Sequence, residues 1–226
     1  MTQPTTHAQS IAARLAAVRG AIERACERAG RSPEDVTLIG VSKTWPADAV
    51  REALAAGLTD FGENRVQEGV SKAAKVGSPA ARWHLIGHLQ TNKVRAALGP
   101  FAILHSVDSE RLLRAISAAA TTPEAIMIEV NVAAEPSKDG VAPAEVAGML
   151  SCAANLPNID VRGLMTVAPH VGDAELVRPV FRELRELAAA NGLRELSMGM
   201  TNDYEVAIEE GATFVRVGRA IFGERQ

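Results

Sequence analysis

The sequence predicts an α/β protein, a single (β/α)₈ TIM barrel with an extra helix at its N-terminus. Short runs of β-branched residues alternate with Ala-rich amphipathic segments, and eight such strand runs follow one another without an interrupting linker. Strands that alternate with helices pair in parallel through right-handed crossovers. Eight units within 226 residues fit one compact barrel and leave little room for a second domain. Periodicity alone does not show closure, so a doubly wound open sheet remains the alternative.

The first predicted element is a helix over residues 8–29, and Gly30 follows it as a stop signal. Apolar residues recur in it at helical spacing, at Ile11, Leu15, Val18 and Ile22. The barrel then spans residues 36–223, and we expect residues 1–226 to form one domain.

The barrel strands are predicted from short runs rich in Val, Ile, Leu and Phe. They cover residues 36–42, 60–63, 83–87, 103–107, 126–132, 161–166, 195–198 and 214–217. The helical patterns between them cover residues 47–56, 65–75, 92–98, 109–119, 144–154, 174–190 and 203–210. Three stretches that contain Pro or Gly, at 77–80, 135–143 and 168–173, are short enough to be loops of the barrel.

Composition narrows the class of protein. Apolar residues make up 47% of the chain, charged residues 23%, and the formal net charge is −3, which favours neither a nucleic acid nor a membrane surface as partner. The two cysteines, Cys26 and Cys152, match no metal-binding spacing and are expected to be free thiols. The chain has no long apolar run and begins with a polar segment, so we expect a cytoplasmic protein.

Lys43 is the first candidate for chemistry. It follows the first barrel strand, at the carboxyl end where barrel proteins bind their ligands. A lysine there is partly desolvated, which favours the neutral amine and makes it a nucleophile toward an aldehyde. The other interpretation is a lysine whose stem covers the strand end while its amine reaches solvent. Position alone does not decide between the two.

The loops after the seventh and eighth strands indicate a phosphate site. Barrel proteins commonly hold phosphate there, and Gly199 and Gly218 would let backbone N–H groups approach its oxygens. Ser197 and Thr201 offer hydroxyl groups. The alternative is that the glycines are turn residues and that a residue near Thr201 is an ordinary helix cap.

Arg216 lies within an otherwise apolar strand, so its buried guanidinium needs a partner. A structural carboxylate such as Glu63 or Glu129 and a ligand are both candidates. For His84 and His105 we expect a hydrogen-bonded structural role, and we expect no metal site.

Taken together, these strand-end segments resemble the pyridoxal phosphate homeostasis protein family, the YggS-like proteins. The matching blocks run in the family's order over nearly the whole chain. They are VSKT at 41–44, FGENRVQE at 61–68, WHLIGHLQTNK at 83–93, RGLM at 162–165, LSMGM at 196–200, VRVG at 215–218 and IFG at 221–223.

The resemblance extends to the barrel domain of bacterial alanine racemase, the fold-type III class of pyridoxal 5′-phosphate (PLP) proteins. It implies that Lys43 forms a Schiff base with PLP and that Arg216 faces the pyridine nitrogen. It also implies phosphate contacts from Ser197 and from the backbone of Gly218 and Arg219. Asn64 is implied as a further pocket residue. Family members often have Thr in place of Arg219 and Ser in place of Thr201. Because Arg219 lacks the Thr hydroxyl, one phosphate hydrogen bond that the family makes is lost, while the backbone N–H remains.

The preferred function is a PLP-binding protein for intracellular PLP homeostasis, which buffers the cofactor and delivers it to PLP-dependent apo-enzymes. The alternative is a small PLP-dependent racemase or lyase. Racemisation needs a second acid–base group, a tyrosine from another domain in the racemase, and this chain has only Tyr204, predicted on a helix. A third hypothesis is a barrel enzyme that uses a phosphorylated metabolite without a cofactor. We expect a monomer that is not itself an enzyme.

Overall fold

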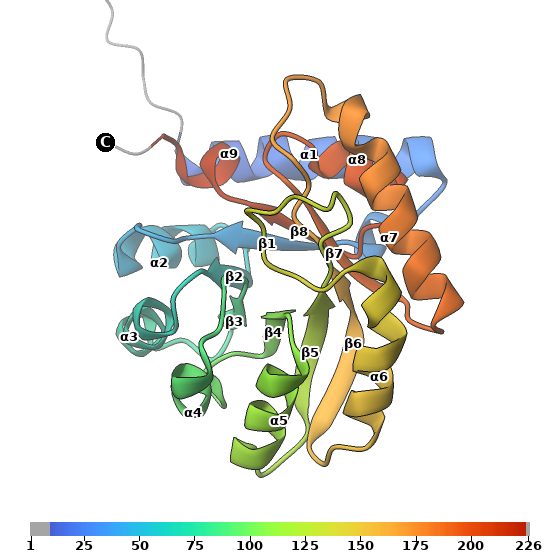
Figure 1. Cartoon of the computed structure of the whole chain (residues 1–226). Coiled ribbons are helices and arrows are strands. Elements are labelled where there is room, and N and C mark those ends of the chain that lie inside the picture. The colour runs from blue at the N-terminus through green and yellow to red at the C-terminus, as the bar shows by residue number, and fades with distance from the viewer. Residues whose placement is uncertain (1–9, 225–226) are drawn as a thin grey trace, which may run out of the picture.

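Eight parallel strands close into a barrel in the computed structural model, which describes residues 10–224 (Figure 1). Strand β1 (Thr37–Val41) hydrogen-bonds to β2 (Asp60–Glu63) on one side and to β8 (Phe214–Val217) on the other. Ile39 consequently stands opposite both Asp60 and Arg216. This closure confirms the predicted TIM barrel and excludes the open sheet.

The remaining elements follow the predicted alternation. The other strands are β3 (Arg82–Leu85), β4 (Ile103–Val107), β5 (Glu124–Glu129), β6 (Ile159–Met165) and β7 (Glu195–Met200). The outer helices are α2 (Ala47–Ala55), α3 (Val66–Val76), α4 (Val94–Ala97), α5 (Glu110–Ala119), α6 (Val146–Ala154), α7 (Arg178–Ala190), α8 (Tyr204–Glu209) and α9 (Arg219–Phe222). Short 3₁₀ turns lie at Pro33–Asp35, Thr91–Lys93, Pro143–Glu145 and Ala174–Val177.

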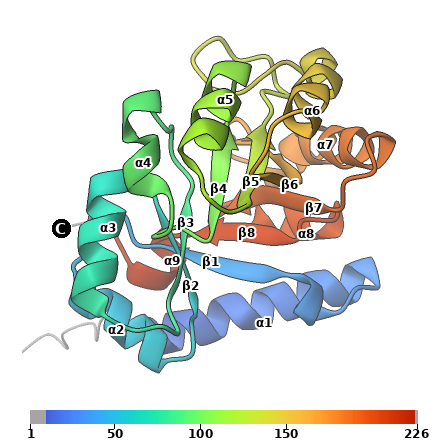
Figure 2. The same cartoon turned by 90° about the horizontal axis from the view of Figure 1, so that it is seen from below.

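The extra N-terminal helix α1 (Ile11–Ala29) lies against α2, α8 and α9, as both views of the chain show (Figures 1 and 2). It begins after Ser10, whose side chain accepts a hydrogen bond from the N–H of Ala13, and it ends at Gly30 with a left-handed backbone. The first two residues of the predicted helix 8–29 lie outside the described residues. No helix in the described part of the chain is long and apolar enough to span a membrane.

Strand ends differ most from prediction at β5, which was predicted over residues 126–132 but ends at Glu129. Asn131 leaves the strand because its side chain binds the backbone of the following loop at Glu135, as both donor and acceptor. Ala134 then adopts a left-handed backbone with φ of 52°. Local side-chain hydrogen bonds of this kind compete with strand pairing, although Val130 and Val132 favour a strand by composition.

The barrel has two separate apolar regions. Between the strands and the outer helices lies the large core, which includes Leu104, Val215 and Val217. Inside the barrel lies a small apolar cluster of Ile39, Met127, Met165 and Phe214. Buried polar side chains share this interior, which barrels normally fill with branched apolar side chains: His105 contacts Phe214, and His105, Ser197 and Arg216 are hydrogen-bonded in line. The polar interior leads directly to the strand ends, where the candidate site lies.

Candidate cofactor site

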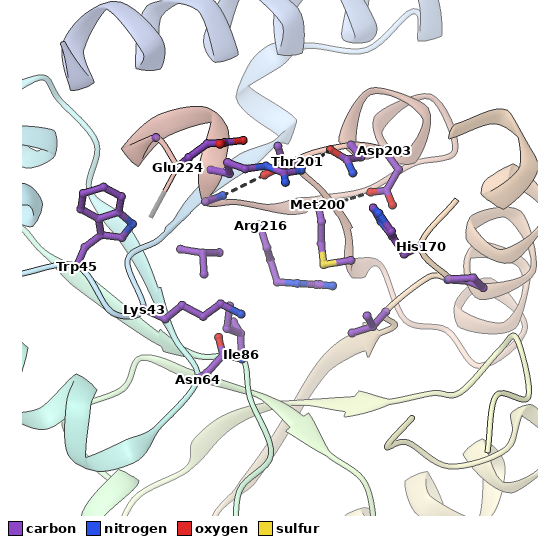
Figure 3. A pocket seen from close by; sticks show the side chains of 17 residues that line it. Lys43, Trp45, Asn64, Ile86, His170, Met200, Thr201, Asp203, Arg216 and Glu224 are labelled. Atoms are coloured by element: carbon purple, nitrogen blue, oxygen red, sulfur yellow. Dashed lines mark hydrogen bonds between the residues drawn. The ribbon is translucent and has the colours of Figure 1, made fainter. Parts of the chain in front are cut away.

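A cavity of about 730 Å³ opens at the carboxyl ends of the strands. Its lining comes from the segments that follow β1, β2, β3, β6, β7 and β8, so it lies where barrel proteins bind their ligands. Figure 3 shows Lys43 and Asn64 on one side of this space, Arg216 at its centre, and His170 with Asp203 on the far side. The volume falls within the range of roughly 300–1,000 Å³ that is typical of small-molecule sites.

Five of the seven residues predicted for the site line this cavity, and so does Thr201. The five are Lys43, Asn64, Arg216, Gly218 and Arg219. Ser197 and Gly199 are not among the lining residues.

Lys43 extends its amine into the cavity from a tight turn after β1 (Figure 3). Thr44, the next residue, has φ of 70°, a conformation that is costly for a β-branched residue. Its N–H donates to Oε1 of Glu68 in α3 at 2.6 Å, which holds the turn in this conformation. Burial alone would raise the pKa of Glu68, but the hydrogen bonds from Thr44 and Lys72 outweigh burial and lower it. Glu68 is therefore ionised and can accept the Thr44 hydrogen bond at neutral pH.

Lys72 is a buried lysine behind this turn, and the sequence reasoning missed it. Its Nζ donates to the backbone oxygen of Ser42 at 2.7 Å, to Glu63 at 2.6 Å and to Glu68 at 3.0 Å. Ser42 also donates its hydroxyl to Glu63 at 2.6 Å. The residues on both sides of Lys43 are thus fixed by one buried ionic network. Glu63 belongs to this network and is not the partner of Arg216.

Arg216 reaches the cavity from β8 while only 4% of it is exposed. One terminal nitrogen donates to Oγ of Ser197 at 2.6 Å and the other to the backbone oxygen of Thr166 at 2.8 Å. Burial lowers the pKa of Arg216 to about 10, and the charges of Glu129 and Asp203 oppose that shift. The guanidinium is therefore cationic at neutral pH. Its direct partners are a hydroxyl and a carbonyl, whereas Glu129 acts on it through charge.

Ser197, for which the resemblance implies a phosphate contact, lies below the residues that line the cavity. It is fully buried inside the barrel, and its hydroxyl is shared between Arg216 and Nδ1 of His105, the latter at 2.9 Å. The side chain points inward because Ser197 shares the inner face of the sheet with Arg216 and His105. Its hydroxyl is consequently engaged within the protein rather than presented to the cavity.

The loops after β7 and β8 meet at the edge of the cavity. The N–H of Gly218 makes one long contact of 3.4 Å with Oγ1 of Thr201, and Arg219 donates to Oδ1 of Asn202 at 3.0 Å (Figure 3). Thr201 carries a hydroxyl group, as does the Ser that the resemblance leads us to expect at this position. A Cβ at Gly218 would lie 3.2 Å from the backbone oxygen of Val41. Because glycine has no side chain, the chain at the end of β8 can pack closely against β1.

Gly199 has a packing role. Its φ is 90°, and a Cβ there would lie 2.6 Å from Cβ of Ala207 and 2.9 Å from Cα of Tyr204. Only glycine lets α8 fold back against β7 at this point. A glycine at the end of a strand indicated a phosphate-binding backbone. A tight connection from a strand to a helix also requires glycine there, so the sequence alone does not separate the two.

Three titratable groups at the cavity were not found from the sequence. His170 is exposed on the loop after β6, Asp203 lies beside it before α8, and Glu224 follows α9 (Figure 3). Asp203 accepts the N–H of Met200 at 2.5 Å, and burial raises its pKa. Tyr204 follows on α8 as predicted, but it is buried in the core and does not line the cavity.

The other three described histidines divide into two groups. His84 and His105 are buried and hydrogen-bonded to each other at 3.0 Å, which confirms the hydrogen bonding predicted for them. His88 lies on the other side of the barrel mouth beside Asp108 and Asp139, and their ligand-type atoms are within 4.8 Å of one another. These three groups are at least partly exposed, and such contacts form commonly as surface ion pairs.

Comparisons with known proteins show which family the sequence matches. The family described as alanine racemase, N-terminal domain, matches residues 14–226. The pyridoxal phosphate homeostasis protein of Aquifex aeolicus is 44% identical over 222 residues, which cover 94% of this chain and 97% of the relative.

Two solved structures show the same architecture. PipY of Synechococcus elongatus, solved with PLP bound, is 38% identical with a TM-score of 0.82, and the match covers 95% of this chain and all of PipY. Alanine racemase of Corynebacterium glutamicum is 20% identical with a TM-score of 0.67, over 92% of this chain and 60% of that enzyme. The second likeness is one of fold alone.

Proposed function

The chain belongs to the pyridoxal phosphate homeostasis protein family and carries the alanine racemase N-terminal domain, and from this premise we propose that it binds PLP at the barrel mouth. The observation that carries the proposal is the convergence of the Lys43 amine and the Arg216 guanidinium in one cavity (Figure 3). PLP supplies an aldehyde that condenses reversibly with amines.

The residues present fit this cofactor. Oδ1 of Asn64 is buried at the cavity and has no hydrogen-bond partner among the described residues, so a ligand that donates a hydrogen bond would satisfy it. Lys43 would hold the aldehyde carbon and Arg216 the pyridine nitrogen. Gly218, Arg219 and Thr201 would hold the phosphate at the rim, where backbone N–H, guanidinium and hydroxyl groups are donors suited to an anion.

Arg216 sets a limit on the chemistry of the site. A guanidinium donates hydrogen bonds but does not give up its proton at neutral pH, so a ring nitrogen that faces it stays unprotonated. An unprotonated ring stabilises a carbanion poorly. The site therefore suits reversible binding of the cofactor better than carbanion chemistry.

The function that follows is PLP homeostasis, with buffering of the cofactor and its delivery to PLP-dependent apo-enzymes. The described cysteines are free thiols, which supports a reducing, cytoplasmic location. The alternative function, a small racemase or lyase, would need His170, Asp203 or Glu224 as its second acid–base group, because Tyr204 does not line the cavity.

A transfer assay separates the two functions. The PLP-loaded protein is incubated with a cofactor-free PLP enzyme, and recovery of that enzyme's activity is followed. In parallel, it is incubated with L- and D-alanine, and exchange of the enantiomers is followed. We expect transfer without exchange above background, since a positioned proton-transfer group contributes roughly 10²–10⁴-fold in rate. Enantiomer exchange that is lost in Lys43→Ala and in one of His170→Ala, Asp203→Ala and Glu224→Ala would instead establish the racemase.

A further inference from the structure

A continuous line of polar side chains crosses the barrel interior from the first residue of β2 to the cavity. Each contact is 2.6–3.0 Å long: Asp60 Oδ1 to His84 Nε2, His84 Nδ1 to His105 Nε2, His105 Nδ1 to Ser197 Oγ, and Ser197 Oγ to Arg216. No member is more than 4% exposed. Only Arg216 lines the cavity, and Asp60 lies at the opposite end of the barrel.

A guanidinium at one end and a carboxylate at the other allow one consistent direction for the hydrogen bonds. Arginine can only donate, so Ser197 accepts from Arg216, and its own proton can then point toward Nδ1 of His105. His105 then carries its hydrogen on Nε2 and donates to Nδ1 of His84. His84 in turn donates from Nε2 to Asp60, whose carboxylate can only accept. In this arrangement each imidazole carries its hydrogen on Nε2.

The surroundings favour this state. Phe214 lies against both imidazoles, with ring centroids 6.0 Å from His84 and 5.6 Å from His105. Burial, together with the neighbouring His84 and Arg216, holds the pKa of His105 well below its usual range. Burial alone would raise the pKa of Asp60, but hydrogen bonds from His84 and Thr59 outweigh it and lower that pKa. An unpaired polar group in this interior would be costly, so the line is held as a unit.

We propose that Asp60, His84 and His105 are positioning residues for the cofactor, which orient Arg216 through Ser197 from the far end of the barrel. The inference rests on the proposed function, because Arg216 is the member that would contact the pyridine ring. It also gives Ser197 a role different from that of a phosphate ligand.

The first test is made on the cofactor-free full chain. Two-bond ¹H–¹⁵N NMR spectra of ¹⁵N-histidine-labelled protein report which ring nitrogen carries the proton, and His84→Gln and His105→Gln assign the signals. We expect both histidines to be neutral with the proton on Nε2 at neutral pH. An imidazolium or an Nδ1–H form at either position would overturn the proposal without reference to PLP.

The second test compares ligands that do and do not contact Arg216. PLP and inorganic phosphate are titrated into each variant, and the tryptophan fluorescence is followed. Asp60→Leu removes the terminal acceptor and should raise the Kd for PLP about tenfold, with the Kd for phosphate unchanged. Asp60→Asn keeps an acceptor oxygen and should bind PLP nearly as the wild type does. Phe181→Leu, a core change in α7 outside the line, controls for lost stability.

The outcomes are distinct. Wild-type PLP affinity in folded Asp60→Leu, or equal loss of PLP and phosphate binding, would overturn the positioning role. If Asp60→Leu does not fold, Ser197→Ala replaces it with the same expectation, and a loss of phosphate binding there would restore Ser197 as a phosphate ligand. Absence of PLP binding by the wild type would refute the proposed function and the positioning role, whereas the NMR spectra would still decide the direction of the hydrogen bonds.

Discussion

At the scale of one residue, Glu129 at the end of β5 makes the free energy of unfolding depend on pH. Burial raises its pKa from 4.5 to about 7, although Arg216 nearby lowers it. Between those two pH values the folded chain holds a proton that the unfolded chain has released. The stability contributed by this group is therefore fully present below the unfolded pKa and is lost as pH rises toward 7.

Glu129→Gln should remove that loss. We expect the variant to gain stability over the wild type as pH rises from about 4.5 to about 8, by at most about 3 kcal/mol. Urea unfolding across this pH range measures the gain. Glu110→Gln, at an exposed position of α5, is the control and should show no such trend. A gain at low pH that vanishes at high pH would contradict the assigned shift.

Single residues differed in how far the sequence could place them. Lys43 stood out because it is a charged residue directly after an apolar strand, and Arg216 because it is a charged residue within one. Both line the cavity. Ser197 was placed at the phosphate by resemblance, since sequence does not show whether a side chain points into the barrel or out to its mouth. Lys72 could have been suspected because it follows Val66 and Gly69 at three-residue spacing on the buried face of α3, but its three acceptors come together only on folding.

At the scale of elements, the turn that carries Lys43 depends on helix α3. Lys72 neutralises buried Glu63 and holds Glu68, which in turn holds the left-handed Thr44. Lys72→Met would leave Glu63 buried without its cation, and we expect a loss of about 3–5 kcal/mol in the free energy of unfolding.

Urea unfolding of matched variants checks this value. Lys75→Met, an exposed lysine on the same helix, should change stability by less than about 0.5 kcal/mol. Adding Glu63→Gln to Lys72→Met should recover part of the loss, because it removes the uncompensated charge. Equal effects of Lys72→Met and Lys75→Met would show that the network contributes nothing.

Helix and strand identities were predictable, whereas their ends were less so. Ser109 shows why: it was predicted within its helix, but its side chain caps α5 by accepting the N–H of Leu112. Asn131 similarly ends β5 by binding the next loop. Side-chain hydrogen bonds decide both ends, and periodicity of apolar residues does not reveal them.

At the scale of the whole molecule, the alternation of strands and helices predicted the barrel, but closure needed the structure. The register of β1 against β8 brings Ile39 opposite Arg216, and the two paired strands carry Val41 and Arg216 to the lining of the cavity. Glycine at position 218 permits that close approach, since a side chain there would press on Val41 two residues before Lys43. Barrel closure and the cofactor site are therefore built by the same contacts.

Covalent mapping of the cofactor tests the central claim most directly. The protein is loaded with PLP, reduced with borohydride, digested, and its peptides are analysed by mass spectrometry. We predict the adduct on Lys43, with loss of the visible absorbance of bound cofactor in Lys43→Ala and its retention in Lys93→Ala, which lies outside the cavity lining. An adduct on Lys93, or none on Lys43, would contradict the assignment of this cavity as the PLP site.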